Sequence, residues 1–109
     1  MIAKRTASSL ECRTSRFTAT YDLPRQVIYI TIGAPQKATG SLSEDEWIIR
    51  KNDSGKVVGI TIWTLDDVIK RMYTDKQWLL ETLSKHVDRE IANDISDALF
   101  LLIPKGDPR

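Results

Sequence analysis

The spacing of apolar side chains changes once along this 109-residue sequence, at Thr64, and that change limits the folds open to the chain. Between residues 17 and 63, apolar residues alternate with polar ones or form short β-branched runs, as they do in strands. From residue 65 onward they recur at every third or fourth position, as they do in amphipathic helices. The sequence therefore predicts an α+β domain whose sheet precedes its helices.

Short strands are expected throughout the first part of the chain. They lie at 17–21, 27–32, 38–43, 47–51 and 56–63. The run Asn52-Asp53-Ser54-Gly55 predicts a hairpin before the last of them, because Asn and Asp tolerate tight turns and Gly adopts the left-handed conformation easily. Short links favour antiparallel neighbours, since parallel strands need long crossovers. We expect an antiparallel meander of four to five strands.

Side-chain alternation indicates which face of this sheet is buried. The core side is marked by β-branched residues on two strands, namely Ile28, Ile30 and Ile32 together with Val58, Ile60 and Ile62. The opposite side is not polar either, since it carries Val27, Tyr29, Val57 and Trp63. Part of that second face is therefore expected to be covered as well.

A first helix is expected at 65–72. Thr64 can cap it, and Asp66 and Asp67 would lie in its first turn, where negative charge is favoured by the helix dipole. The apolar residues of this segment fall on one side, so the helix should pack on the sheet.

A second helix is expected at 75–103, opened by a capping box of Thr74 and Gln77 and carrying one apolar stripe. An unbroken helix there would be about 43 Å long at ~1.5 Å per residue, whereas strands of five or six residues span only ~17–20 Å. The helix therefore either breaks near residues 84–86, which would give three helices, or overhangs the sheet. An overhanging stripe would bury itself against another molecule, most simply a second copy.

The ends of the chain are expected to be loose, which leaves a single domain over 16–103. Residues 1–15 read as a flexible basic arm, because their basic side chains outnumber the one acidic side chain. The segment 104–109 reads as a loose tail. The arm resembles no signal peptide, and no apolar run approaches the ~20 residues that span a bilayer.

The charge balance and the single cysteine exclude several classes of protein. Sixteen basic and fifteen acidic residues leave a formal charge of +1, so no overall field steers the chain to nucleic acid or to an anionic membrane. Cys12 is the one cysteine, so neither an intrachain disulfide nor a cysteine-based zinc cluster can form. A cytoplasmic location fits best.

A resemblance to a known family is carried by the strands. The residues are Tyr21-Asp22, then Ile28-Tyr29-Ile30, and finally the run from Asp53 through Gly55-Lys56-Val57-Val58-Gly59 to Ile62. Together they resemble the small bacterial proteins of the DUF2283 domain family of unknown function, over about residues 16–65. Thr61 departs from the acidic residue usual there, Trp47 lies where a small residue is usual, and 74–109 extends beyond the resemblance. The resemblance implies no activity, but it suggests a small toxin-like partner.

Residues for catalysis or for binding a metal or cofactor are not apparent. Cys12 and His86 are single and far apart in sequence, and no His or Cys spacing fits zinc. The acidic clusters at 44–46 and 66–67 could hold Mg²⁺, yet turn and helix-start chemistry explains both. We therefore expect no catalytic, metal-binding or cofactor-binding residue and no enzyme.

The function that the sequence favours is protein binding without catalysis, in the form of an antitoxin-like inhibitor or a homodimer. The contact residues would be large apolar side chains on the helical stripe, namely Trp78, Val87, Ile91, Ile95 and Leu99, all of which could instead belong to the core. The alternative is a small nucleic-acid-binding protein that uses the basic arm and an aromatic sheet face with Tyr29, Trp47 and Trp63.

Overall fold

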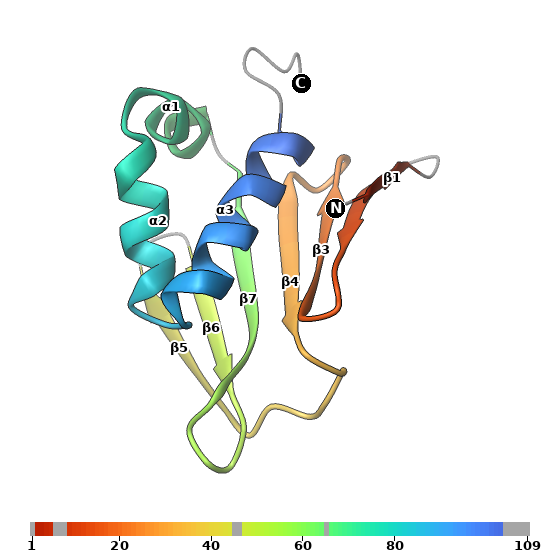
Figure 1. Cartoon of the computed structure of the whole chain (residues 1–109), viewed down its shortest axis with the longest axis vertical. Helices are drawn as coiled ribbons and strands as arrows, with labels where there is room; N and C mark the ends of the chain where they lie inside the picture. The colour runs from red at the N-terminus through yellow and green to blue at the C-terminus, as the bar shows by residue number, and fades with distance from the viewer. Residues whose placement is uncertain (1, 6–8, 45–46, 65, 104–109) are drawn as a thin grey trace.

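The computed structural model describes residues 2–5, 9–44, 47–64 and 66–103, which form seven strands followed by three helices (Figure 1). The strands are β1 (Ile2–Arg5), β2 (Ser9–Arg13), β3 (Phe17–Asp22), β4 (Val27–Ile32), β5 (Gly40–Glu44), β6 (Trp47–Lys51) and β7 (Val57–Trp63). The helices are α1 (Asp66–Thr74), α2 (Lys76–Ser84) and α3 (Arg89–Leu102). The predicted α+β class, with an antiparallel sheet followed by C-terminal helices, is confirmed.

The strands form one sheet in the order β1-β2-β3-β4-β7-β6-β5, and each neighbouring pair in the described residues is antiparallel. The order is not the single continuous meander that we expected, because residues 33–39 carry the chain to β5 at the far edge and β7 returns beside β4. This step crosses three strand spacings, or about 14 Å. A link of that length reaches about 23 Å when extended, so it makes the crossing without strain.

The N-terminal residues form a hairpin, which corrects the prediction of a flexible arm at 1–15. β1 pairs with β2, and β2 pairs with β3, so both strands extend the sheet. The reason is that inward-facing and charged side chains alternate along β2, a pattern that a count of charges does not reveal. Leu10 packs against the core and Cys12 is fully buried in it, whereas the charged residues beside them are more exposed. Cross-strand contacts of such inward side chains stabilise an edge strand even in a basic segment.

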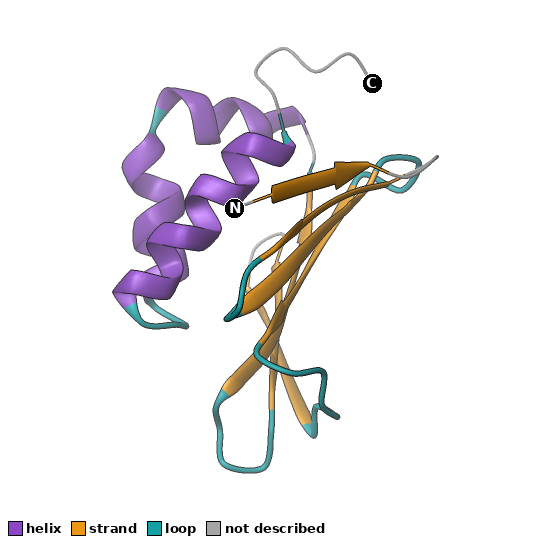
Figure 2. Ribbon diagram, turned by 45° about the vertical axis from the view of Figure 1, so that its right-hand side comes forward, coloured by secondary structure: helices purple, strands orange, loops and turns teal. Residues whose placement is uncertain are grey.

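The three helices lie on one face of the sheet (Figure 2). α2 ends at Ser84 and α3 begins at Arg89, so the stripe at 75–103 is divided between two helices that lie side by side in both views (Figures 1 and 2). The Ser84 hydroxyl donates to the Leu80 carbonyl at 2.7 Å, an internal bond that weakens a helix at such a position. α3 is about 21 Å long at ~1.5 Å per residue, which matches a strand and leaves no overhang.

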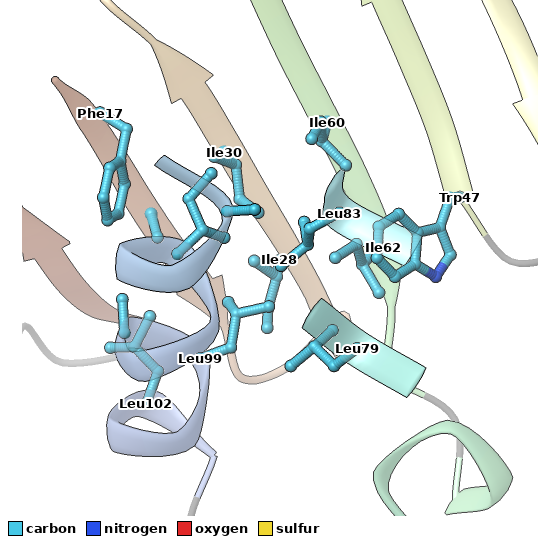
Figure 3. Packing of buried hydrophobic residues seen from close by; sticks show 14 of the residues in the cluster. Phe17, Ile28, Ile30, Trp47, Ile60, Ile62, Leu79, Leu83, Leu99 and Leu102 are labelled. Carbon is cyan, nitrogen blue, oxygen red and sulfur yellow. The ribbon is translucent and has the colours of Figure 1, made fainter. Parts of the chain in front are cut away.

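The core lies between the sheet and the helices (Figure 3). From the strands, Phe17, Ile28, Ile30, Ile60 and Ile62 point into it, and from the helices, Leu79, Leu83, Leu99 and Leu102. Each of these side chains is at most 2% exposed. Burying one aliphatic side chain of this size contributes about 1.5–3 kcal/mol, so this layer supplies most of the driving force for folding.

The hairpin before β7 is built as predicted. The side-chain oxygen of Asn52 accepts hydrogen bonds from the backbone N–H groups of Ser54 and Lys56, at 3.1 and 3.0 Å. Gly55 has a φ of 81°, a left-handed conformation that glycine adopts without strain. These bonds fix where β7 begins.

The cap of α2 differs from the prediction. Thr74 is the last residue of α1, and Asp75 caps α2 by accepting from the Trp78 N–H at 3.2 Å. The Thr64 hydroxyl donates to the Gln26 carbonyl at 2.8 Å, and the Thr64 N–H donates to the same oxygen at 2.8 Å. Thr64 thus holds the turn before β4, where Gln26 has a φ of 56°. The sequence did not indicate this hydrogen bond from the Thr64 hydroxyl to the turn before β4.

Candidate binding face

The helical stripe packs against the core, and two of its five predicted contact residues are fully buried there. Ile95 and Leu99 are at most 1% exposed, so no partner can reach them in this fold. Trp78, Val87 and Ile91 are half-buried and pack against the core. The Trp78 ring meets Trp47 edge-on, with ring centroids 6.3 Å apart, and α2 is thereby fixed over β6. The stripe therefore serves the chain's own sheet.

The other face of the sheet is left open by the described helices, all of which lie on the first face (Figure 2). We call it the open face. Its described side chains are those at the outward positions of the strands, namely Ser9, Glu11, Arg13, Thr18, Thr20, Asp22, Val27, Tyr29, Thr31, Ile48, Arg50, Val58, Thr61 and Trp63. Among these described residues, the face carries four threonines, two aromatic rings and two arginines.

Tyr29 and Trp63 are the exposed aromatic side chains of the open face, at 39% and 37% exposure. Tyr29 pairs with Thr61 across β4 and β7, and Val27 pairs with Trp63, so the two rings occupy diagonal positions on adjacent strands. Val27, next to both in the register, is only 5% exposed. The rings therefore belong to one apolar patch.

Trp47, which we had placed on the same face as these rings, lies on the core side instead. It pairs with Ile62, a core residue, and is 3% exposed. The predicted face of Trp47 was wrong because a one-residue change in register moves a side chain to the opposite face of a sheet.

A β-bulge also exchanges the faces of two neighbouring valines. The pairing of β6 with β7 shifts between Arg50 and Lys51, with Arg50 opposite Gly59 and Lys51 opposite Val57. Val57 joins the core, whereas Val58 faces Tyr29 and Arg50 on the open side, the reverse of the predicted alternation. An extra residue in one strand has this effect, and such bulges often re-aim side chains near binding sites.

A pocket of about 260 Å³ lies beside the bulge. It is lined by residues of β4, β6, β7 and the 33–39 link, namely Tyr29, Ile30, Thr31, Pro35, Gln36, Ala38, Arg50, Val58 and Gly59. The link thus covers part of the open face, as the apolar residues there had suggested. The Asn52 amide donates to the Gln36 side-chain oxygen at 3.3 Å, which joins the link to the β6–β7 hairpin.

Two arginines at this side of the sheet lie beside carboxylates. Arg25 donates to the Asp22 carboxylate at 2.9 Å, and this hydrogen bond lowers the pKa of Asp22 and raises the pKa of Arg25. Arg13 lies 3.5 Å from the carboxylate of Glu11. Two of the arginines at this side of the sheet are therefore neutralised by neighbours.

The residues considered for catalysis are not brought together into one site. Cys12 lies buried in β2, and burial raises the pKa of its thiol. His86 lines a separate cavity of about 110 Å³ with residues such as Val57 and Ile91, and Cys12 is not part of that lining. Among the described residues, no three His, Cys, Asp or Glu side chains gather as metal ligands would.

The acidic clusters have the local roles that the sequence suggested, so far as the structure describes them. Asp66 and Asp67 lie in the first turn of α1, where the Asp67 carboxylate accepts from the Val68 N–H at 3.0 Å. Of the cluster at 44–46, residues 45 and 46 lie outside the described part of the chain. None of the helices that the structure describes has the length and the apolar character needed to cross a membrane.

Comparison with known proteins adds no family to these observations: no protein-family model, curated protein or solved structure matches the chain. The resemblance of residues 16–65 to the DUF2283 family stays a prediction. The candidate site is therefore defined by its geometry, which is an open sheet face with two exposed rings and a pocket lined by Arg50.

Proposed function

We propose that this chain is a non-enzymatic protein-binding module whose contact surface is the open face of its sheet. The observation that carries the proposal is the position of Tyr29 and Trp63, two large rings exposed on adjacent strands of that face. Aromatic and arginine side chains are enriched in the centres of protein interfaces, where they contribute most of the binding energy. On the helical stripe, Ile95 and Leu99 are buried and cannot take this role.

The charge of the open face favours a protein over a nucleic acid. Arg13 and Arg25 each lie beside a carboxylate, which leaves Arg50 as the unpaired arginine among the described residues of this face, so the face offers little net charge to a phosphate backbone. Binding of nucleic acid depends strongly on uncompensated cations. A protein surface, by contrast, is matched by mixed polar and aromatic groups. In the cytoplasm, an antitoxin-like inhibitor or a homodimer would each meet this description.

Nucleic-acid binding remains the second candidate because Tyr29 and Trp63 share a sheet face, as bases that stack on a sheet require. It makes a distinct prediction. Retention of RNA or DNA would fall steeply with salt, whereas a complex held by aromatic burial would be nearly insensitive to salt.

The test is a pull-down from native lysate with the wild-type chain, a double variant Tyr29→Ser/Trp63→Ser, and the control Leu101→Ser. Leu101 is 51% exposed on α3, away from the open face, so it matches the double variant in removing exposed apolar area. We expect one stoichiometric protein that the wild type and the control retain at high salt and the double variant loses. Equal retention by all three would place the contact elsewhere.

Two further results of the same experiment would redirect the proposal. Nuclease-sensitive retention that disappears at high salt would favour the nucleic-acid candidate. Retention of the chain by itself alone, with a mass above 12.4 kDa in light scattering, would identify the partner as a second copy.

A further inference from the structure

The pocket on the open face contains a cation that the described residues leave without a partner. Arg50 is half-buried and lines the pocket, and no carboxylate in the described part of the chain lies within ion-pair distance of it. Arg13, Arg16 and Arg25 each have such a neighbour, and Arg71 and Arg89, which have none among the described residues, are exposed. A partly buried guanidinium loses part of its hydration, so an anion placed beside it is bound more strongly than at an open surface.

The position of Arg50 depends on Gly59, the residue opposite it on β7. A Cβ atom at Gly59 would lie 3.6 Å from Nη1 of Arg50 and 3.7 Å from its Cβ. The Arg50 side chain therefore folds across β7 over the bare backbone of Gly59. The bulge places Val58 beside it on the same face. Together they hold the guanidinium at the wall of the pocket.

The remaining lining combines hydrogen-bonding groups with apolar surface. Tyr29, Thr31 and Gln36 bring two hydroxyls and an amide. Pro35, Ala38 and Val58 bring apolar surface from the link and the bulge. No acidic side chain is among the residues that line the pocket. This lining suits a ligand with one negatively charged end and an apolar body.

We propose that this pocket binds a small organic acid through its carboxylate, which would accept paired hydrogen bonds from the Arg50 guanidinium. The planar fork of arginine matches the two oxygens of a carboxylate. One guanidinium balances a monoanion, whereas a phosphate dianion would keep an uncompensated charge. A volume of about 260 Å³ equals that of about eight or nine waters, which is below the size of most drug-binding sites.

This site does not require the proposed function, since a small ligand can occupy the pocket with or without a protein on the open face. The test uses 3-phenylpropionate as the probe, 3-phenylpropanamide as the neutral ligand of the same shape, and inorganic phosphate as the dianion. Backbone amide NMR spectra of the ¹⁵N-labelled chain are recorded during each titration, at constant ionic strength. The variants are Arg50→Gln, Arg50→Lys and the control Arg25→Gln.

We expect saturable shifts at the amides of Tyr29, Thr31 and Gly59 with 3-phenylpropionate, with a Kd of about 1 mM or tighter. 3-Phenylpropanamide and phosphate should bind at least tenfold more weakly than 3-phenylpropionate. Arg50→Gln should abolish binding, Arg50→Lys should weaken it because the fork is lost, and Arg25→Gln should leave it unchanged.

Three results would overturn the proposal: no saturable shift with the acid, equal binding of acid and amide, or binding that survives Arg50→Gln. Preference for phosphate would also overturn it, because the pocket would then be built for a dianion. If Arg50→Gln does not fold, the proposal is decided by comparing the binding of 3-phenylpropionate with that of 3-phenylpropanamide on the wild-type chain. The pull-down with Tyr29→Ser/Trp63→Ser measures protein binding, whereas the titration measures ligand binding. The proposed function and the ligand site can therefore fail independently.

Discussion

The two faces of this sheet are made by the same strands yet differ in composition and in what covers them. On the helix side, every second residue of β4 is isoleucine, and those side chains are at most 7% exposed. On the open side, β4 presents Val27, Tyr29 and Thr31, of which Tyr29 is exposed, Thr31 is half-buried and Val27 is buried. Alternation along a strand lets one segment build a core and a contact surface at once. Substitutions at neighbouring positions of one strand can therefore alter the stability and the function of this chain separately.

Adjacent positions on β4 give the sharpest test of that separation. Ile30→Ala should destabilise the chain by about 2–5 kcal/mol, because it opens a cavity in the core. Thr31→Ala, on the open face, should cost less than about 1 kcal/mol, the span of strand propensities. Urea unfolding measures both. Similar losses at the two positions would mean that the open face is packed as a second core.

Thr61 differs from the exposed residues of the open face because it is buried, and a conservative substitution can test its contribution to stability. It is 2% exposed although no described helix covers it, and its hydroxyl has no hydrogen-bond partner among the described residues. Thr61→Val keeps the shape and removes the buried polar group, so it should stabilise the chain by about 1 kcal/mol. Thermal unfolding measures this. A loss of stability would show that the hydroxyl is satisfied by water.

The smallest expected effect concerns Asp22 and Arg25 at one end of the open face. The hydrogen bond from Arg25 lowers the pKa of Asp22 in the folded chain, so this pair stabilises the fold above the ordinary carboxyl pKa of about 3.9. The contribution is lost as the pH falls through the lowered pKa. NMR titration of the Asp22 carboxyl carbon should give a midpoint below about 3.9 in the wild type and close to it in Arg25→Gln. An unchanged midpoint would mean that the pair is open in solution.

Local patterns predicted the central strands accurately. The runs at 27–32 and 47–51 were predicted with the bounds that the structure has, because β-branched residues there are bounded by turn residues. The hairpin at Asn52 was also predicted correctly, since its turn chemistry is contained within four residues.

Features that depend on distant partners were missed. β2 pairs with β3, a contact that the local sequence does not show, and the basic charges of the N-terminal segment gave the stronger signal. The faces of Val57 and Val58 depend on a bulge, and a bulge is a property of two strands rather than one. The pocket was missed for the same reason, because Arg50, Gly59 and the 33–39 link meet only in the folded sheet.

The pairing of β4 with β7 has a consequence for how the chain folds. The first four strands can form as successive local hairpins, and so can β5, β6 and β7. These two units become one sheet only when β7 docks on β4, which requires closing the intervening segment at a cost in chain entropy. We expect this docking, the longest-range event in the sheet, to set the folding rate. Shortening the 33–39 link would then alter the speed of folding more than the speed of unfolding.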